Sequence, residues 1–233
     1  MNFSEFEHIL SHKRIERYLM ACHGRKRKTM LLYNQNIRLA KEMFVIVNYF
    51  EVALRNAIDQ QVKNILGEDW LRDAVMPGGV FDNPKCKDSQ KIIYARCMAL
   101  KECGEYSHDK LLSSLEFGIW RYMFSPTQFK GTGQVLLRVF PNKPKSSAAM
   151  QYNHVYFFNE LNYINMLRNR IAHHEPICFS QKKHDVNTTY IHEQYERIMR
   201  LFRMMGINSK KLLKNVDYVN MVCNEIEKNI IKQ

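Results

Sequence analysis

Glycine and proline are scarce in this chain, with 9 and 6 among 233 residues, and most of them are gathered in a few short stretches. Because these residues interrupt regular structure most strongly, long stretches without them favour long helices joined by few loops. The longest stretch runs from about residue 29 to residue 66, has a helical pattern and is followed by Gly67. The sequence therefore predicts an all-α fold with one very long helix.

The other expected helices follow from the same spacing argument. A first helix is expected from about residue 4 to residue 22, with Gly24 as its stop. The remaining helices are expected over residues 88–103, 108–124, 150–174, 189–205 and 209–231. A loop is expected at residues 77–84, and the segment 125–146 is expected to be irregular and basic, since it combines prolines and glycines with lysines and arginine.

Length and composition fit a single domain over residues 1–233. With 45% apolar and 25% charged residues, the chain can bury a core without disulfide or metal staples. We expect residues 1–28 to form an N-terminal helix and a basic turn. Residues 29–233 would then form the helical core.

The charge balance points to a polyanionic partner. Lys and Arg total 35 and Asp and Glu total 23, a net charge of +12. No apolar run reaches the ~20 residues that a membrane span needs, and the N-terminus lacks the pattern of a secretory signal. The six cysteines are scattered without a C-x-x-C pair, which is typical of reduced thiols. A cytoplasmic protein that binds nucleic acid rather than membrane is expected.

One segment, residues 161–176, contains the candidate catalytic residues. Two arginines, an amide and two adjacent histidines crowd its end: Arg168, Asn169, Arg170, His173 and His174. At ~100° per residue, Asn169 and His173 share one stripe of a helix, while Arg170 and His174 share another. RNA cleavage without metal needs a base, an acid and fixed positive charge, which these side chains can supply. An ordinary polar surface at a helix end is the alternative.

A zinc site is a weaker interpretation of the same segment. It would use the two histidines with Glu175 and Cys178. Adjacent histidines diverge on a helix, and no second cluster of ligands is evident. We therefore expect no metal.

The segment also carries a resemblance to a known family. Arg168 and Asn169, followed at the fourth position by His173, match the Arg, polar residue, His signature of HEPN ribonucleases. Four phrases in order are similar to the Abi-like (abortive infection, AbiD and AbiF) family of bacterial HEPN proteins. They are residues 11–18 (SHKRIERY), 49–58 (YFEVALRNAI), 114–120 (SLEFGIW) and 168–176 (RNRIAHHEP).

The resemblance implies a HEPN-like helical bundle of phage defence or toxin–antitoxin type, with a signature helix ending near residue 175. It implies a homodimer whose two signature helices form one metal-independent endoribonuclease site, without a cofactor. Arg168 would stabilise the phosphate, Asn169 would orient groups and His173 would be the acid/base. His174 also lies within the permitted spacing. RNA rather than DNA is the implied substrate, and a small noncoding RNA can serve as antitoxin in the AbiF branch.

The second phrase supplies a supporting set. Glu51 and Arg55 have i,i+4 spacing and could form an ordinary surface pair. They and Asn56 stand amid apolar neighbours, however, where a charge needs partners. We therefore expect Glu51, Arg55 and Asn56 to line a buried wall behind the histidines, with Arg170 as a further supporting residue.

Two basic clusters are candidate RNA contacts, with a solvated surface as the alternative for each. They consist of Arg25, Lys26, Arg27 and Lys28, and of Lys130, Arg138, Lys143 and Lys145. Two other functions remain open at this point. The chain could be a HEPN module that binds RNA without cutting it, or a helical interaction adaptor.

Overall fold

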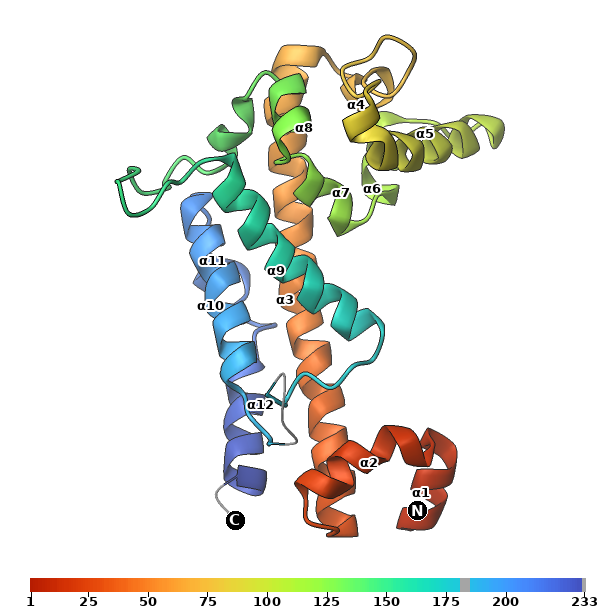
Figure 1. Ribbon diagram of the computed structural model, residues 1–233, viewed down its shortest axis with the longest axis vertical. Helices are drawn as coiled ribbons and strands as arrows, with labels where there is room; N and C mark the ends of the chain where they lie inside the picture. Colours follow the sequence, from red (N-terminus) through yellow and green to blue (C-terminus); the bar gives the residue numbers. More distant parts are fainter. Residues whose placement is uncertain (181–184, 232–233) are drawn as a thin grey trace. The chain divides into compact units, whose positions relative to one another are not determined.

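The computed structural model describes residues 1–180 and 185–231, and within these ranges the chain is helical and has no β-strand (Figure 1). One isolated antiparallel bridge pairs Phe179 with Val186. The all-α prediction is confirmed. No helix of the described ranges is both long enough and apolar enough to cross a membrane.

The elements follow one another with connections of very different length. The first part of the chain forms α1 (Phe3–Leu10), α2 (His12–Ala21), α3 (Lys26–Leu66), α4 (Trp70–Asp73), η1 (Pro84–Cys86), α5 (Lys87–Glu102), α6 (His108–Ser114) and α7 (Phe117–Tyr122). The rest forms α8 (Pro126–Gly131), η2 (Val135–Val139), α9 (His154–Ala172), α10 (Thr189–Met204), α11 (Ser209–Leu212), α12 (Val219–Ile226) and the π-helical turn η3 (Glu227–Ile231). The longer connections lie between α4 and η1, between η2 and α9, and between α9 and α10.

Helix α3 is the very long helix that the sequence predicts. It has 41 residues and is about 60 Å long at 1.5 Å per residue. Gly67 ends it with a φ of 88°, a left-handed conformation that glycine adopts without steric penalty. A stripe of buried side chains recurs every three or four residues, as an amphipathic helix requires. Its members are Leu39, Met43, Ile46, Phe50, Leu54, Ile58 and Val62.

Three expected helices are interrupted where neither glycine nor proline marks a break. The first splits at Ser11, whose φ of 70° turns the chain between α1 and α2. This break lets Phe6 of α1 and Tyr18 of α2 both pack on Tyr33, with ring centroids 5.4 and 5.1 Å apart. The second, over 108–124, splits at the extended residues Leu115 and Glu116. The third, over 209–231, splits between α11 and α12.

The segment 125–146 is more ordered than the sequence indicates. It contains α8 and η2, which bury Phe129 and Leu136. Phe140 is also buried and stacks on Phe157 of α9, with ring centroids 3.9 Å apart. Residues 142–151 complete the connection without helix. Apolar anchors therefore hold most of this segment on α9.

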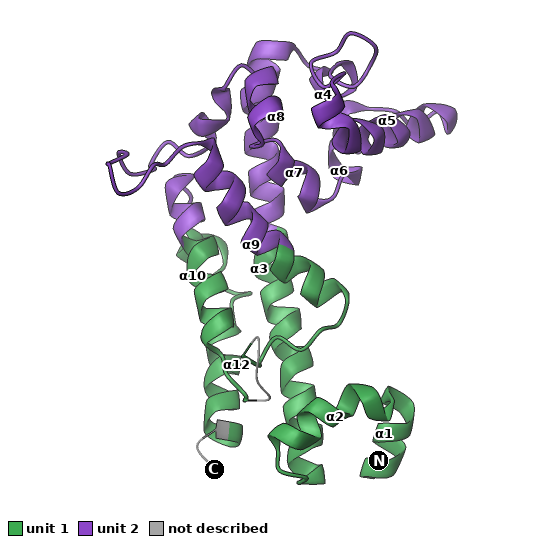
Figure 2. Cartoon of the chain, viewed as in Figure 1, with its two compact units in different colours: residues 1–48, 166–199, 209–233 green, residues 49–165, 200–208 purple. Residues whose placement is uncertain are grey.

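The chain forms two compact units (Figure 2): unit 1 comprises residues 1–48, 166–199 and 209–233, and unit 2 comprises residues 49–165 and 200–208. In unit 1, α2 packs on the N-terminal part of α3, and the Tyr18 ring meets the edge of Phe179 at 5.2 Å. The hydroxyl of Tyr195 on α10 donates to Asp217, which precedes α12. Burial and these contacts join segments that are far apart in sequence.

Unit 2 has its own aromatic core. Phe50 of α3 meets Phe202 of α10 edge-on, with ring centroids 5.3 Å apart. A polar network accompanies this core around the buried carboxylate of Asp59 on α3. Asp59 accepts hydrogen bonds from Trp70 Nε1 at 2.7 Å and His108 Nε2 at 2.6 Å. These bonds tie α3 to α4 and α6.

Candidate active site

The residues of the signature segment stand at the C-terminal end of α9. The helix ends at Ala172, so the two histidines lie just beyond it. The amide of His174 donates to the Ile171 carbonyl at 3.0 Å, and the amide of Glu175 donates to the Arg170 carbonyl at 2.8 Å. This pair of bonds is the Schellman ending of a helix. Its left-handed position, usually a glycine, is occupied by His174 with a φ of 56°.

This ending corrects two expectations. The signature helix stops before both histidines rather than near residue 175. The helical stripe that would pair His174 with Arg170 does not exist, because His174 has left the helical conformation. The relation of Asn169 to His173 does hold, since the His173 amide donates to the Asn169 carbonyl at 2.9 Å.

The predicted catalytic side chains reach the surface together at this end. Asn169, His173 and His174 are exposed, and Arg168 is half-buried. Arg168 Nη1 lies 3.5 Å from Asn169 Oδ1, the outer limit of a hydrogen bond. Arg168, Asn169 and His173 therefore lie within about one helical turn of one another along the chain, and of these three His173 lines a basic groove beside α2.

Arg170 fixes the turn that follows the helix. Its Nη2 donates to the carbonyl of Pro176, and its Nε donates to Glu175 Oε2 at 3.3 Å. The guanidinium also lies over the ring of Tyr190, 4.7 Å from its centroid. Arg170 therefore holds the backbone of the turn. Its support of a catalytic site stays a prediction, and its contacts differ from the phosphate-stabilising role expected of Arg168.

Asn36 of α3 anchors the next residues of the chain. Its Oδ1 accepts hydrogen bonds from the amides of Ile177 and Cys178, at 2.9 and 3.2 Å, and the side chain is buried. Burial raises the pKa of the Cys178 thiol to about 12, so this group stays protonated at neutral pH. Within the described ranges, no group of three histidine, cysteine or acidic side chains is arranged to hold a metal ion.

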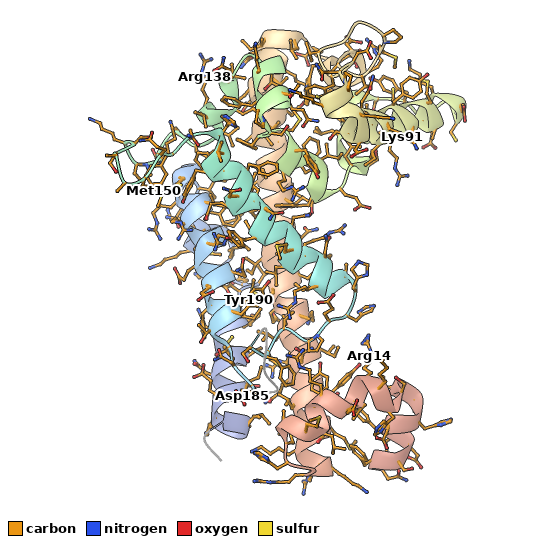
Figure 3. The ribbon with its side chains drawn as sticks, viewed as in Figure 1. Arg14, Lys91, Arg138, Met150, Asp185 and Tyr190 are labelled. Atoms are coloured by element: carbon orange, nitrogen blue, oxygen red, sulfur yellow. The ribbon has the colours of Figure 1, made fainter. Side chains whose placement is uncertain are left out.

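A groove of about 430 Å³ lies between α2 and the end of the signature segment. Helix α2 and the residue before it contribute Ser11, Lys13, Arg14, Arg17 and Tyr18; the signature segment contributes His173, His174, Glu175 and Pro176. Figure 3 shows Arg14 on α2, on the side that faces the chain after α9. Sequence reasoning singled out the phrase 11–18 but gave its cations no role. The sequence pattern that could have identified them is the i,i+1,i+4 spacing of Lys13, Arg14 and Arg17, which places the three side chains on one side of a helix.

Hydrogen bonds fix the two arginines across the groove. Arg14 Nη1 donates to the carbonyl oxygen of His174 at 3.3 Å, and Arg17 Nη2 donates to that of Ser180 at 3.1 Å. The Arg17 guanidinium also lies 4.5 Å from the centroid of the Phe179 ring. These contacts hold the turn that bears the histidines against α2.

The groove is positively charged and has a constrained backbone. Its three cations face one acidic group, Glu175, which already pairs with Arg170. Two of its lining residues, Ser11 and His174, have positive φ, a conformation that side chains rarely adopt. Such residues cluster at functional sites. Charge and backbone together mark this groove as the candidate active site.

A second groove, of about 310 Å³, shares His174 and Glu175 of this turn with the basic groove. Its apolar lining comprises Ile37, Ala40, Phe44, Ile171 and Ala172, and His174 borders it as well. Phe44 is 46% exposed and Ile37 42% exposed. The turn after α9 therefore borders both a basic groove and an apolar one.

The supporting set of the second phrase belongs to unit 2, whereas the histidines belong to unit 1. Glu51 and Arg55 are half-buried, and Asn56 is exposed, so Asn56 does not line a buried wall as expected. Arg55 Nε is buried without a hydrogen-bond partner among the described residues. The role of Glu51 and Arg55 behind the histidines stays a prediction.

The two predicted basic clusters fall in different units as well. Arg25 precedes α3, and Lys26, Arg27 and Lys28 form its first turn, so the expected basic turn is largely helical. Arg25, Lys26 and Arg27 are exposed, as are Lys130, Arg138 and Lys145, whereas Lys28 and Lys143 are half-buried. Arg138 extends from η2 of unit 2 in Figure 3. Their contact with RNA remains a prediction.

Comparison with known proteins assigns the family. Searches of curated proteins and of solved structures found no significant match. A family model described as Abi-like protein matches residues 2–178, a range that contains α2, α3, α9 and both histidines. Abi-like refers to abortive infection, a form of phage defence. Because the match covers well over half of the 233 residues, this chain belongs to the Abi-like protein family.

Proposed function

We propose that this chain is a metal-independent HEPN endoribonuclease that acts in phage defence or as the toxin of a toxin–antitoxin pair. The observation that carries the proposal is the exposed His173 on the wall of a basic groove, one turn after Arg168 and Asn169. The net charge of +12 supports a nucleic-acid substrate. Such an enzyme would act in the cytoplasm.

The chemistry is an internal transesterification. A base removes the proton of the ribose 2′-hydroxyl, and the 2′-oxygen attacks the adjacent phosphorus. The bond from phosphorus to the 5′-oxygen breaks, and an acid gives that oxygen a proton, leaving a 2′,3′-cyclic phosphate and a 5′-hydroxyl. Histidine suits both proton transfers near neutral pH. The Arg168 guanidinium would stabilise the doubly charged phosphorane, and Asn169 would orient His173 or the phosphate.

Two arrangements can supply the second proton-transfer group. Both histidines of one chain line the same groove, so the expectation that helical geometry separates them no longer applies. Alternatively, a two-fold dimer would place a second His173 beside the first. We favour the dimer, because the apolar groove with exposed Phe44 and Ile37 borders the histidine-bearing turn, and a second copy of this chain would cover that exposed apolar surface.

A cleavage assay tests the proposal. Purified protein is incubated with labelled RNA in EDTA, and the products are analysed for 2′,3′-cyclic phosphate ends. The unmodified chain should cut, and the exposed-site variant His173→Ala should lose at least about 100-fold in rate with an unchanged circular dichroism spectrum. RNA that is bound but never cut would instead identify a non-catalytic RNA-binding module. Full activity in His173→Ala would overturn the site assignment.

A further inference from the structure

We propose that the basic side of α2 positions the substrate, with Lys13 and Arg14 holding RNA phosphates next to the scissile one. The inference rests on the proposed function for its substrate. It assigns a role to residues of α2 that the signature does not include. The substrate strand would then lie along the groove between α2 and the turn that bears His173.

Lys13 and Arg14 are placed beside the predicted catalytic histidines. Lys13 and Arg14 line the same groove as both histidines, so a phosphate held by them lies in the space that the imidazoles border. Arg14 Nη1 is 3.3 Å from the carbonyl oxygen of His174, which places its guanidinium directly beside this turn. That bond uses one of the five N–H donors of the guanidinium, whose planar fork suits phosphate oxygens.

The charge of the groove also favours a phosphate. The carboxylate of Glu175, the acidic group of the groove, pairs with Arg170 at 3.3 Å. The cations of α2 therefore meet little opposing charge there. Lys13 is exposed, and a mobile ammonium on a flexible stem can bind phosphate as a point charge.

The three cations of α2 differ in their contacts. Arg17 donates to the Ser180 carbonyl and lies on the face of Phe179, so it is committed to the fold. Within the described ranges Lys13 carries no such hydrogen bond or ring contact, and the side-chain hydrogen bond of Arg14 goes to the histidine-bearing turn. Substrate binding is therefore assigned to Lys13 and Arg14, and maintenance of the groove to Arg17.

Binding is measured apart from cleavage. An RNA oligonucleotide with methylated 2′-hydroxyls cannot undergo internal attack, so fluorescence anisotropy reports its affinity alone. The variants are Lys13→Glu, Arg14→Gln and the double variant. Lys214→Glu, at an exposed site of unit 1 outside the groove, is the control matched in charge to Lys13→Glu. Affinity is measured at several salt concentrations, and circular dichroism checks the fold of each variant.

We expect each groove variant to weaken binding about tenfold and to reduce the slope of log affinity against log salt by about one per lost phosphate contact. The control should change both quantities much less. With natural RNA the groove variants should raise KM more than they lower kcat, because they hold the strand rather than transfer protons.

The outcomes separate the two proposals. If the unmodified chain cuts RNA while Lys13→Glu and Arg14→Gln keep its affinity and salt slope, the positioning role is overturned and the enzyme stands. If binding depends on Lys13 and Arg14 but no RNA is cut, the enzyme is overturned and the binding role stands. Equal losses in Lys214→Glu and in the groove variants would also overturn the positioning role, since only net charge would then matter.

Discussion

Arg14 and His174 are 160 residues apart in sequence, and the Arg14 side chain donates a hydrogen bond of 3.3 Å to the His174 carbonyl. This bond connects the second helix of the chain to the turn that ends its signature helix. It makes the groove a product of two distant segments. The arrangement leads to predictions about the turn, its anchors and the surfaces beside it.

His174 can be tested without disturbing the turn. His174→Gly should fold with stability equal to the unmodified chain or up to about 1 kcal/mol higher, because glycine adopts a positive φ without strain. His174→Ala keeps the strain and serves as the comparison. Urea unfolding measures both. If His173 is the acid/base, His174→Gly should retain most cleavage activity; loss of activity in a stable His174→Gly would assign proton transfer to His174.

Substitutions of Arg168 and Arg170 should affect different properties, catalytic activity for Arg168 and stability for Arg170. Arg170→Ala removes bonds to the Pro176 carbonyl and Glu175 and should lower the free energy of unfolding by about 1–3 kcal/mol. Arg168→Ala should change stability by less than about 1 kcal/mol and abolish cleavage. Urea unfolding and the cleavage assay are run on both variants. An Arg168→Ala variant that cuts RNA normally would contradict the assigned role.

The Asn36 side chain should be essential for the stability of the segment after the histidines. Asn36→Leu leaves two buried amides, those of Ile177 and Cys178, without an acceptor. The free energy of unfolding should fall by about 2–4 kcal/mol, since each unsatisfied group costs about 1–3 kcal/mol. Asn36→Asp keeps an acceptor oxygen and is the matched control. At low pH, where the new carboxyl is protonated and uncharged, its free energy of unfolding should fall less than that of Asn36→Leu. Equal losses in both variants at every pH would contradict this account.

The Asp59 network predicts a specific acid response. Burial raises the pKa of Asp59, but hydrogen bonds from His108, Trp70 and Lys63 outweigh it and leave the pKa below the ordinary value of 3.8. Below pH 3.8 the unfolded carboxyl therefore binds more protons than the folded one, so stability rises with pH in that range. This stabilising contribution of Asp59 is complete above about pH 5, where the unfolded carboxyl is ionised, and disappears as pH falls through the folded pKa.

Asp59→Asn should remove that response. Its free energy of unfolding at pH 7 should be lower by about 1–3 kcal/mol, and its stability should fall less between pH 4 and pH 2. Urea titrations across this range compare it with the unmodified chain. A variant curve parallel to the unmodified one would show that Asp59 does not carry the effect.

The apolar groove predicts the oligomeric state. Phe44→Glu places a charge in the groove and should turn a dimer into a monomer by light scattering, with a matching loss of cleavage. Ile9→Glu, at a residue of the same unit that is 65% exposed, is the control and should stay dimeric. An excess of His173→Ala subunits should also depress activity more than dilution alone. A monomeric unmodified chain with full activity would refute the composite site.

Local signals in the sequence determined the helices and the spacing of the signature. The run without glycine or proline and the stop at Gly67 are properties of neighbouring residues, and α3 follows from them within three residues at its start. The four-residue step from Asn169 to His173 likewise holds, because one helical turn relates the two residues.

Only the tertiary structure decided which segments meet and where helices break. No glycine or proline lies near Ser11 to indicate the turn there. The packing of α1 and α2 on Tyr33 favours this turn. His174 takes a glycine's place because its turn is held by Arg170, while Asn36 anchors the residues that follow. The joining of Arg14 to this turn depends on how distant helices pack, a free energy that no local spacing encodes.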